Sequence, residues 1–477
     1  MRSNFVHCVA VVALLGCTGA EKKPDETAGG DADGPVLLDP PVEVTPPPFE
    51  PARAASGPTL IRDATVLTAA GPVWTRGWVR LENGRIADLG EGDAPAAREG
   101  ETVVEGKGRW VTPGLIDTHS HLGVYASPGV WAHADGNEMT NPITAGVRAE
   151  EAFWPQDPGL ERAVAGGVTT LHVLPGSGNL MGGRGVTLKL NPAREAAAMR
   201  FPGAKDSLKM ACGENPKRVY GRDKGSMPMS RMGSLYMMRS RWLEARRYKV
   251  KWDQWRKKPY DLKDGKKIPT NPPDRDLVLE TLAGVLSGEI LPQVHCYRAD
   301  EMLLQLKVAR EMGYRVRSFH HAVEAYKIRD VLAKEEVSVS TWADWWGFKI
   351  EAWDGVEANI ALLQEAGARA IVHTDSAEGI QRMNQEAAKA LATGRALGMK
   401  LDENTALRWI TANPAWALGI EAETGTLEKG KMADVVVWDA HPFSVYAHAE
   451  KVFVDGHLRH DRTAPPKAPW SDFEVYR

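Results

Sequence analysis

The sequence predicts an α/β fold in which a (β/α)8 barrel is joined to a small β-sandwich. Between residues 113 and 419, short apolar runs alternate with amphipathic segments, which is typical of βα units around a parallel sheet. A region of roughly 300 residues suits eight such units with insertions. Residues 58–112 and 420–477 instead show short strand patterns with turn signals. The two ends of the chain can therefore pair into one β-domain.

The composition is that of an ordinary globular protein. Of the 477 residues, 43% are hydrophobic and 25% are charged, and the net charge is −3. Because the chain carries no strong basic excess, we expect no nucleic-acid partner. A small-molecule or dipeptide-like substrate is the expected partner, and a homo-oligomer stays open.

Residues 1–17 resemble the signal peptide of a bacterial lipoprotein. Their apolar run, residues 8–15, is too short to span a bilayer and leads into Leu-Leu-Gly-Cys, so Cys17 is the expected lipid anchor. An ordinary secretory signal is the alternative. Residues 18–57 are rich in Pro, Gly and acidic residues and are expected to form a disordered linker. We therefore expect an exported protein of the cell envelope, held to the outer membrane only by its lipid and facing the periplasm.

Two hairpin signals support the β-domain. Asn83-Gly84 separates two strand-like runs near the N-terminus, and Asp455-Gly456 does the same near the C-terminus. Both dipeptides favour the tight turns that join antiparallel strands. These hairpins are the expected building blocks of the sandwich.

The barrel strands are expected where apolar runs recur between helical segments. The first ends at His119 and His121, and the third follows a Gly-rich loop at residues 176–185. The other strands are predicted as short buried runs with polar ends. In chain order the eight are expected near residues 111–121, 168–175, 186–190, 207–214, 290–296, 314–321, 337–345 and 368–375.

The connections include two clear amphipathic helices, at residues 300–312 and 381–397. Residues 239–273 form a basic, Trp-bearing insertion that is expected to be a long solvated helix and a loop. Cys212 and Cys296 are expected to be buried thiols, because two cysteines do not make a disulfide framework.

Residues of metal-ligand type gather at the predicted carboxyl ends of the strands. His119 and His121 are two positions apart, so their side chains leave the strand on the same face. In a barrel of this type the carboxyl ends form the catalytic rim. Four imidazoles and two carboxylates there would complete the ligands of two divalent cations bridged by a water. The six residues are His119, His121, Glu214, His295, His321 and Asp375.

These motifs resemble the amidohydrolase superfamily, in the branch similar to imidazolonepropionases and metal-dependent dipeptidases. The resemblance covers nearly all of residues 60–459. It implies a distorted TIM barrel with a β-sandwich built from both terminal segments. The motifs that carry it are VTPGLIDTHSH, GENPKRVYG, HCYRADE, HAVEAYKI, ADWWGFK, HTDSAE and GTLEKGKMADVVVWD.

The resemblance also implies roles for single residues. His119 and His121 match the first-strand ligands of the more buried metal, and His295 and His321 match the ligands of the second metal. Asp375 matches the last-strand carboxylate that touches metal and water, with a helix N-cap as its alternative role. The cations are expected to be two zinc ions, with iron or manganese as substitutes and a single-metal site still open.

The bridging ligand on the fourth strand has two candidates. Relatives use either a carboxylated Lys or a Glu, and here Lys209 and Glu214 compete. Their odd separation puts them on opposite faces of a regular strand, so only one points inward. Glu214 is preferred because it is nearer the rim.

The implied function is metal-dependent hydrolysis of a non-glycosidic carbon–nitrogen bond in an amide, peptide or cyclic amide. A metal-activated water would attack the carbonyl, with Asp375 moving the proton. A deaminase acting on a cyclic amidine and a non-catalytic surface binding protein are the alternatives. Trp342, Trp345 and Trp346 either line the cleft or pack against a helix. The candidates for contact with the substrate are Arg184, Arg218, Tyr220 and His320.

Overall fold

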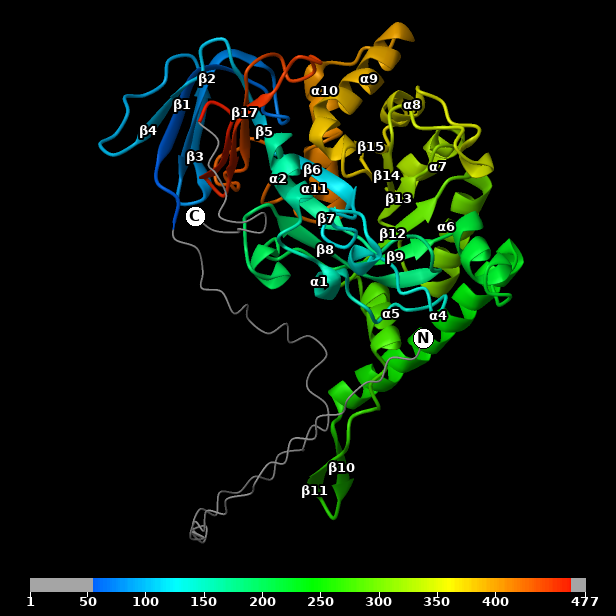
Figure 1. The fold of residues 1–477 in the computed structure, drawn as a ribbon. Coiled ribbons are helices and arrows are strands. Elements are labelled where there is room, and N and C mark those ends of the chain that lie inside the picture. Colours follow the sequence, from blue (N-terminus) through cyan, green and yellow to red (C-terminus); the bar gives the residue numbers. More distant parts are fainter. Residues whose placement is uncertain (1–54, 465–477) are drawn as a thin grey trace, which may run out of the picture. The chain divides into compact units, whose positions relative to one another are not determined.

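The computed structural model describes residues 55–464 (Figure 1). The predicted signal peptide, the anchor Cys17, the linker up to residue 54 and the last thirteen residues of the predicted β-domain lie outside this range. The described residues fall into two compact units, of which residues 259–272 are one and the remainder the other.

The smaller unit is a β-hairpin. Its strands β10 (Tyr260–Lys263) and β11 (Lys266–Pro269) pair antiparallel around Asp264 and Gly265, both of which have positive φ. The ammonium of Lys267 lies 4.4 Å from the centroid of the Tyr260 ring. The sequence analysis expected a loop here, and its Asp-Gly turn signal was overlooked.

Eight strands of the larger unit form the barrel sheet in the predicted chain order (Figure 1). The sheet is nearly closed, and most of its residues are fully buried. The strands are β6 (Leu115–Ser120), β7 (Val168–Val173), β8 (Met181–Lys189), β9 (Ser207–Ala211), β12 (Leu291–Cys296), β13 (Ser318–His321), β14 (Ser338–Thr341) and β15 (Arg369–Val372).

The third barrel strand departs from the prediction. β8 begins at Met181 instead of Val186 and runs antiparallel to both β7 and β9, whereas all other neighbours are parallel. Only the short segment 174–180 connects β7 to β8. A parallel pair needs a long crossover, so a connection of this length makes an antiparallel pair.

Between β15 and β6, the backbone of residues 409–410 connects the two edges of the barrel sheet through hydrogen bonds. The amide of Ile116 in β6 donates to the carbonyl of Ile410 at 2.9 Å, and the amide of Val372 in β15 donates to Trp409 at 3.0 Å. At the carboxyl ends, the amide of Asp375 donates to the carbonyl of His119 at 3.1 Å. The last strand therefore delivers Asp375 directly beside the first strand.

Helices follow the strands and pack their apolar sides on the sheet. The helices predicted at residues 300–312 and 381–397 are confirmed as α6 and α9, and α6 buries Met302 and Leu306. The helices of the described range are α1 (Ala149–Ala152), α2 (Pro158–Ala165), α3 (Glu214–Lys217), α4 (Arg231–Lys257), α5 (Leu277–Ser287), α6 (Ala299–Met312), α7 (Arg329–Lys334), α8 (Asn359–Glu365), α9 (Met383–Ala396), α10 (Glu403–Arg408) and α11 (Ala412–Leu418).

The helix of the basic insertion is longer and less solvated than predicted. α4 begins at Arg231, where the Ser230 hydroxyl accepts a hydrogen bond from the amide of Gly233. It buries Met238 and Trp242, and the Trp242 ring stacks on Tyr314 at 4.4 Å. None of the helices in the described range is long and apolar enough to cross a membrane.

The two terminal segments meet in one eight-stranded sheet, as predicted. β5 pairs antiparallel with β16, so that Trp110 lies opposite Trp438. Asn83, Gly84, Asp455 and Gly456 all have positive φ, which confirms both predicted hairpin turns. The division of this sheet into two packed layers stays a prediction. The strands are β1 (Thr59–Val66), β2 (Trp74–Glu82), β3 (Arg85–Glu91), β4 (Thr102–Glu105), β5 (Trp110–Pro113), β16 (Val435–Trp438), β17 (Ala449–Val454) and β18 (His457–Asp461).

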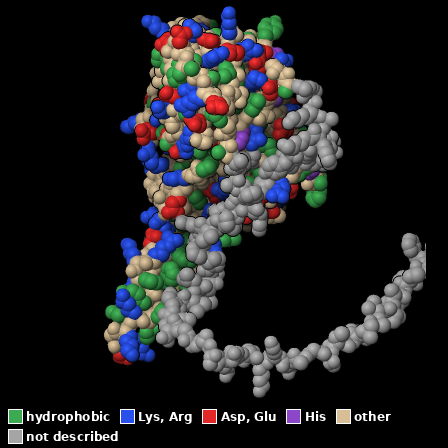
Figure 2. Space-filling view, turned by 90° about the vertical axis from the view of Figure 1, so that its left-hand side faces the viewer, with side chains coloured by type: hydrophobic (Ala, Val, Ile, Leu, Met, Phe, Trp, Pro, Cys, Tyr) green, Lys and Arg blue, Asp and Glu red, His purple; other side chains and the backbone are tan. Residues whose placement is uncertain are grey.

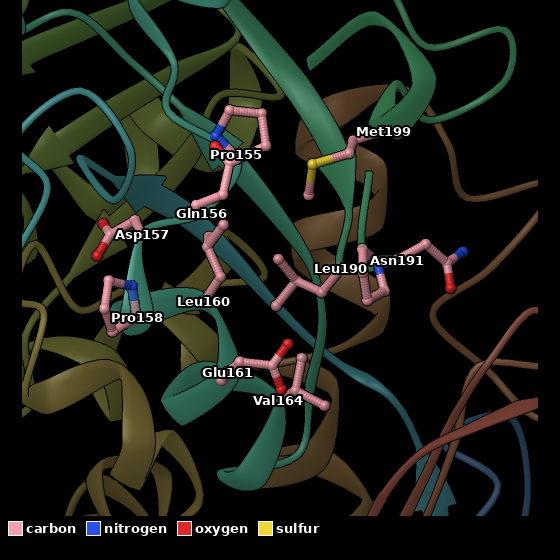
Figure 3. A pocket seen from close by; sticks show the side chains of 11 residues that line it. Pro155, Gln156, Asp157, Pro158, Leu160, Glu161, Val164, Leu190, Asn191 and Met199 are labelled. Carbon is pink, nitrogen blue, oxygen red and sulfur yellow. The ribbon is translucent and has the colours of Figure 1, made fainter. Parts of the chain in front are cut away.

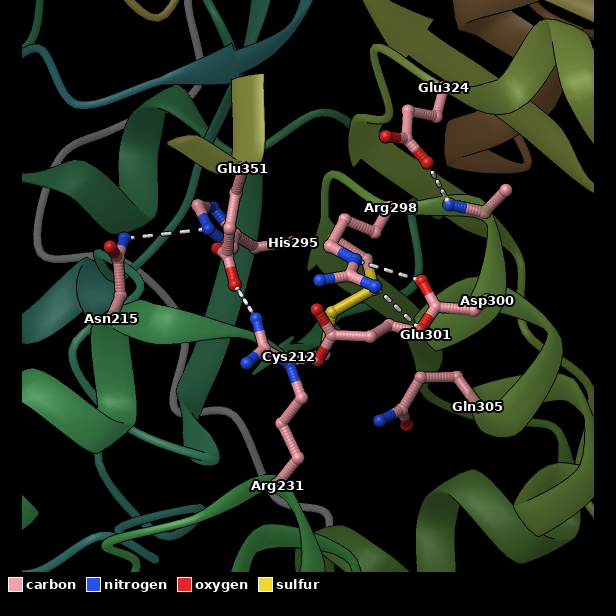
Figure 4. The surroundings of a disulfide bond; sticks show 12 residues. Cys212, Asn215, Arg231, His295, Arg298, Asp300, Glu301, Gln305, Glu324 and Glu351 are labelled. Atoms are coloured by element: carbon pink, nitrogen blue, oxygen red, sulfur yellow. Dashed lines mark hydrogen bonds and ion pairs between the residues drawn. A yellow bond between two sulfur atoms is a disulfide. The ribbon is translucent and has the colours of Figure 1, made fainter. Parts of the chain in front are cut away.

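Cys212 and Cys296 form a disulfide, and the prediction of two buried thiols was wrong (Figure 4). Cys212 follows β9 and Cys296 ends β12, and these strands are neighbours in the sheet. Their Cα atoms lie 5.2 Å apart, well within the range that a disulfide spans. The two cysteines are 84 positions apart in the sequence, so only the strand order brings the two sulfurs together.

Basic and acidic side chains are interspersed over the face shown in Figure 2. This distribution agrees with a net charge near zero and gives that face no single sign.

Candidate metal centre

His119 and His121 converge as the spacing predicted. Their Nε2 atoms lie 3.3 Å apart at the carboxyl end of β6, and the His119 side chain is 1% exposed. The Nδ1 atom of His121 lies 2.8 Å from the carbonyl oxygen of Leu174, which orients the ring. The Nε2 atoms of both imidazoles are thereby directed to one point.

The carboxylate of Asp375 lies next to these two imidazoles and forms with them a first group of potential metal ligands. Its Oδ1 atom lies 3.3 Å from Nε2 of His121 and 3.6 Å from Nε2 of His119. Burial opposes ionisation, but the hydrogen bond and charge of His121 outweigh it and hold the pKa of Asp375 below its usual value. Asp375 has a positive φ of 49°, a conformation that costs energy and is found at functional sites. It does not cap α9, whose N-cap is Arg382.

A second group of imidazoles, from the ends of β12, β13 and β15, surrounds His119. Metal-ligand atoms of His119, His321 and His373 all lie within 4.8 Å of one another, as do those of His119, His121 and Asp375. The His295 ring lies 4.5 Å from the His321 ring, centroid to centroid. The two groups share His119, so the structure brings five of these six side chains into two overlapping sets of potential ligands.

Four buried nitrogens on three of these rings have no hydrogen-bond partner among the described residues. Nδ1 of His295, Nδ1 of His321 and both ring nitrogens of His373 are buried without a hydrogen bond to any described residue. Burial lowers the pKa of all three rings, that of His373 to about 3, so they are neutral. A buried nitrogen lone pair without a partner costs free energy, and coordination of a divalent cation would remove that cost.

His373 was missed by the sequence analysis. It stands two positions before Asp375 at the end of the eighth strand. The same alternation that selected His119 and His121 would have selected the pair His373 and Asp375.

The structure brings Lys209, and not Glu214, to the histidines. Lys209 is 1% exposed, its Nζ atom lies 3.2 Å from Nε2 of His119, and burial lowers its pKa to about 7. Glu214 instead lies with its Oε1 atom 3.4 Å from Nζ of Lys349, and its side chain is 32% exposed. Glu214 does not reach the histidines because β9 ends at Ala211 and Glu214 already belongs to α3. Because Glu214 lies outside β9, the alternation of side chains along that strand does not determine where Glu214 points.

His320 lies beneath the centre and is fully buried. Its Nδ1 atom lies 2.9 Å from Nδ1 of His119, and its Nε2 atom lies 2.7 Å from Oε1 of Gln293. His320 is therefore positioned to orient His119 from behind. The buried Asp117, which was also missed, accepts a hydrogen bond from the amide of His119 at 3.0 Å.

The other residues predicted to contact substrate are engaged elsewhere. The Arg184 guanidinium donates to the hydroxyl of Thr281 at 2.8 Å and lies 3.6 Å from the Asp206 carboxylate. Tyr220 is 1% exposed and donates its hydroxyl to the carbonyl of Asn141. Arg218 is exposed. In this structure the side chains of Arg184 and Tyr220 are thus bound to other parts of the scaffold, and their contact with substrate stays a prediction.

A pocket of about 140 Å³ lies apart from these histidines (Figure 3). Its walls come from α2, the preceding residues 155–157 and the segment around Leu190. Asp157 in this wall is buried and accepts hydrogen bonds from the amides of Gly123 and Gly159. The pocket contains none of the potential metal ligands, so the candidate site is the histidine cluster.

Comparisons with known proteins place the chain in a family. The profile described as "Amidohydrolase family" matches residues 324–460. The amidohydrolase tasK of Hapsidospora irregularis is 30% identical over 434 residues, which are 85% of this chain but 43% of that protein. The chain thus spans less than half the length of this curated relative. An imidazolonepropionase of Mesorhizobium japonicum is 25% identical, over 81% of this chain and 93% of that protein.

A solved structure is similar over most of the chain. The crystal structure of an amidohydrolase from Thermotoga maritima is 32% identical and covers 85% of this chain and 100% of its own, with a TM-score of 0.76. Sequence and fold agree over the whole of that protein, and the described histidine cluster has the ligand chemistry expected from the resemblance. The chain therefore belongs to the amidohydrolase family, whose members are hydrolases acting on carbon–nitrogen bonds.

Proposed function

We propose that this protein is a metal-dependent hydrolase that cleaves a non-glycosidic carbon–nitrogen bond in an amide, peptide or cyclic amide. The observation that carries the proposal is the Asp375 carboxylate held against two imidazoles, beside buried imidazole nitrogens that have no partner among the described residues. Such a cluster has the donors that zinc, iron and manganese accept.

The residues that would hold the metal are those whose ligand atoms converge. They are His119, His121, His321, His373 and Asp375, with His295 beside them and Lys209 against His119. A bound divalent cation supplies Lewis-acid activation of water and of the substrate carbonyl. We propose zinc as the resident ion, in one or two copies.

Asp375 is the proposed proton carrier. Its Oδ1 atom faces His119 and His121, while Oδ2 lies 3.9 Å from Nδ1 of His321. With its pKa held low, the carboxylate is ionised at neutral pH and can accept the proton of the attacking water. The same group can then return that proton to the leaving nitrogen, acting as acid after acting as base.

Lys209 is the proposed bridge between the two metal positions, after reaction with carbon dioxide. Burial brings its pKa to about 7, so a substantial fraction of the amine is neutral at neutral pH. A neutral amine attacks CO₂ through its nitrogen lone pair and releases one proton, which leaves a carbamate with two oxygen donors. Glu214 is too engaged with Lys349 to take this place.

The proposed reaction is tested by metal analysis together with a substrate panel. The panel contains acyl-amino acids, dipeptides and cyclic ureides, and the zinc-loaded protein is expected to release an amine plus a carboxylate from at least one of them. Release of ammonia from a ring carbon would instead indicate a deaminase. Stoichiometric metal without turnover of any member would favour the surface binding protein and contradict the proposal.

We also propose that the protein is exported and anchored through a lipid on Cys17. The Cys212–Cys296 disulfide supports export, because disulfides persist in oxidising compartments such as the periplasm. In protein purified from the cell envelope, thiol titration under denaturing conditions is expected to find Cys212 and Cys296 oxidised. Cys17→Ser is expected to move the protein from the membrane fraction to the soluble periplasmic fraction, and retention of that variant in membranes would contradict the anchor.

A further inference from the structure

Large apolar side chains are exposed in one short segment next to the candidate metal centre. We call residues 342–353, which follow β14, the aromatic segment. Its exposed members are Trp345 (43%), Trp346 (53%), Phe348 (57%), Ile350 (78%) and Trp353 (64%). Single exposed apolar residues are normal, but such a concentration marks a surface that contacts a ligand.

The aromatic segment reaches the metal centre through stacked rings. The buried Trp342 stacks on His321 with centroids 4.6 Å apart and an interplanar angle of 27°. Trp345 stacks in turn on Trp342 at 5.4 Å and 21°. Phe348 lies 5.8 Å from Trp342 and 6.2 Å from Tyr297, and the Tyr297 ring stacks on His321 at 5.2 Å. Trp345 and Phe348 are therefore exposed rings one neighbour away from a potential metal ligand.

The aromatic segment is held in place at several points. Glu351 is 3% exposed, and its carboxylate forms an ion pair with the guanidinium of Arg231 at the start of α4 (Figure 4). A second ion pair holds the segment at Asp344, which contacts Lys389, and a third, between Asp354 and Lys327, lies directly after its last residue. A surface fixed in this way loses little conformational freedom when it binds a ligand.

The charges next to the exposed rings are paired. The Lys349 ammonium lies 3.9 Å from the centroid of the Tyr297 ring and 3.4 Å from the Glu214 carboxylate. Glu351 is paired with Arg231. Lys349 and Glu351 thus each have an oppositely charged partner, and the exposed rings beside them offer an apolar surface.

We propose that Trp345 and Phe348 receive a large apolar or aromatic side chain of the substrate, adjacent to the scissile carbon–nitrogen bond. This inference rests on the proposed hydrolase function and specifies the substrate class. Contact with either exposed ring removes apolar substrate surface from water, which favours phenyl and branched aliphatic groups over methyl. The stacking through Trp342 and Tyr297 keeps that group close to the histidines and hence to the reacting atoms.

The test compares matched probes that differ only in the side chain. N-acetylphenylalaninamide and N-acetylalaninamide each carry one amide on either side of that side chain. We expect the zinc-loaded protein to bind the phenylalanine probe at least about tenfold more tightly by calorimetry, and to show the same preference in kcat/KM. Trp345→Ala and Phe348→Ala are each expected to reduce this preference to within about threefold, mainly through KM.

Trp353→Ala is the matched control. Trp353 is an equally exposed tryptophan of the same segment, and it makes no ring stacking contact with the described aromatic residues. This variant is expected to keep the wild-type preference, and thermal melting of all variants checks that they fold. Equal binding of both probes by the wild type, or an unchanged preference in both Trp345→Ala and Phe348→Ala, would overturn the inference.

The two proposals fail in different ways. Turnover of both probes without discrimination would refute the proposed apolar contact and leave the hydrolase function standing. Discrimination in calorimetry without turnover of any probe or panel member would support that contact and refute the hydrolase function.

Discussion

Asp375→Asn is expected to lower kcat by about 10³-fold while leaving most of the metal bound. An amide is nearly the same size as a carboxylate and keeps one oxygen donor, but it cannot take up the proton of water at neutral pH. The other described side chains that converge with Asp375 are imidazoles and the Lys209 amine, so no second carboxylate stands ready in that group. The measurement is kcat on the best panel substrate, together with metal content by mass spectrometry.

Asp330→Asn is the control for this experiment. Asp330 lies exposed in the first turn of α7, so the same chemical change there is expected to leave kcat within about twofold, as surface substitutions usually do. Turnover of Asp375→Asn within tenfold of the wild type would refute the assigned role. Loss of all metal in that variant would show that Asp375 acts mainly as a ligand.

Lys209→Ala is expected to have the second large effect. If the carbamate of Lys209 bridges the metal positions, its removal should lower metal content and reduce kcat/KM by at least about 100-fold, the upper range for disturbing a metal's supporting groups. Added acetate or propionate is expected to restore part of the activity, because a small carboxylate can occupy the space left by the side chain. Mass spectrometry of the native protein should show an added mass of one CO₂.

Glu214→Gln is the variant to compare with Lys209→Ala, since the sequence favoured Glu214 as the bridging ligand. Its carboxylate contacts Lys349 at the surface of the site, so we expect kcat/KM to stay within about threefold of the wild type. The reverse order of effects, with Glu214→Gln more damaging than Lys209→Ala, would restore Glu214 as the bridge.

Much of the fold was predictable because it depends on local periodicity. Alternation between apolar runs and amphipathic helices identified eight strands, and turn chemistry at Asn83-Gly84 and Asp455-Gly456 identified two hairpins. The direction of β8 was not predictable in this way. Part of β8 is Gly-rich and was taken for a loop, so the connection between β7 and β8 was predicted to be longer than it is.

The positions of the candidate ligands were predictable where the residues belong to a strand, because alternation then determines which face of the strand they occupy. His119 and His121 leave β6 on one face, and their spacing alone put them together. The position of Glu214 could not be predicted from strand alternation, because β9 ends before it. For the pair His320 and His321, the structure places His321 among the potential ligands and His320 behind His119.

What the sequence determined by itself is therefore the list of strands, the turn positions and the convergence of polar residues at one rim, since each depends on spacing within a single element. Only the tertiary structure decided which strands are neighbours. That order brought Cys212 to Cys296, Lys209 and His373 to His119, and Trp342 to His321. These contacts join residues that are far apart in the chain. Their distances are set by the packing of the barrel sheet, which cannot be read from any local pattern in the sequence.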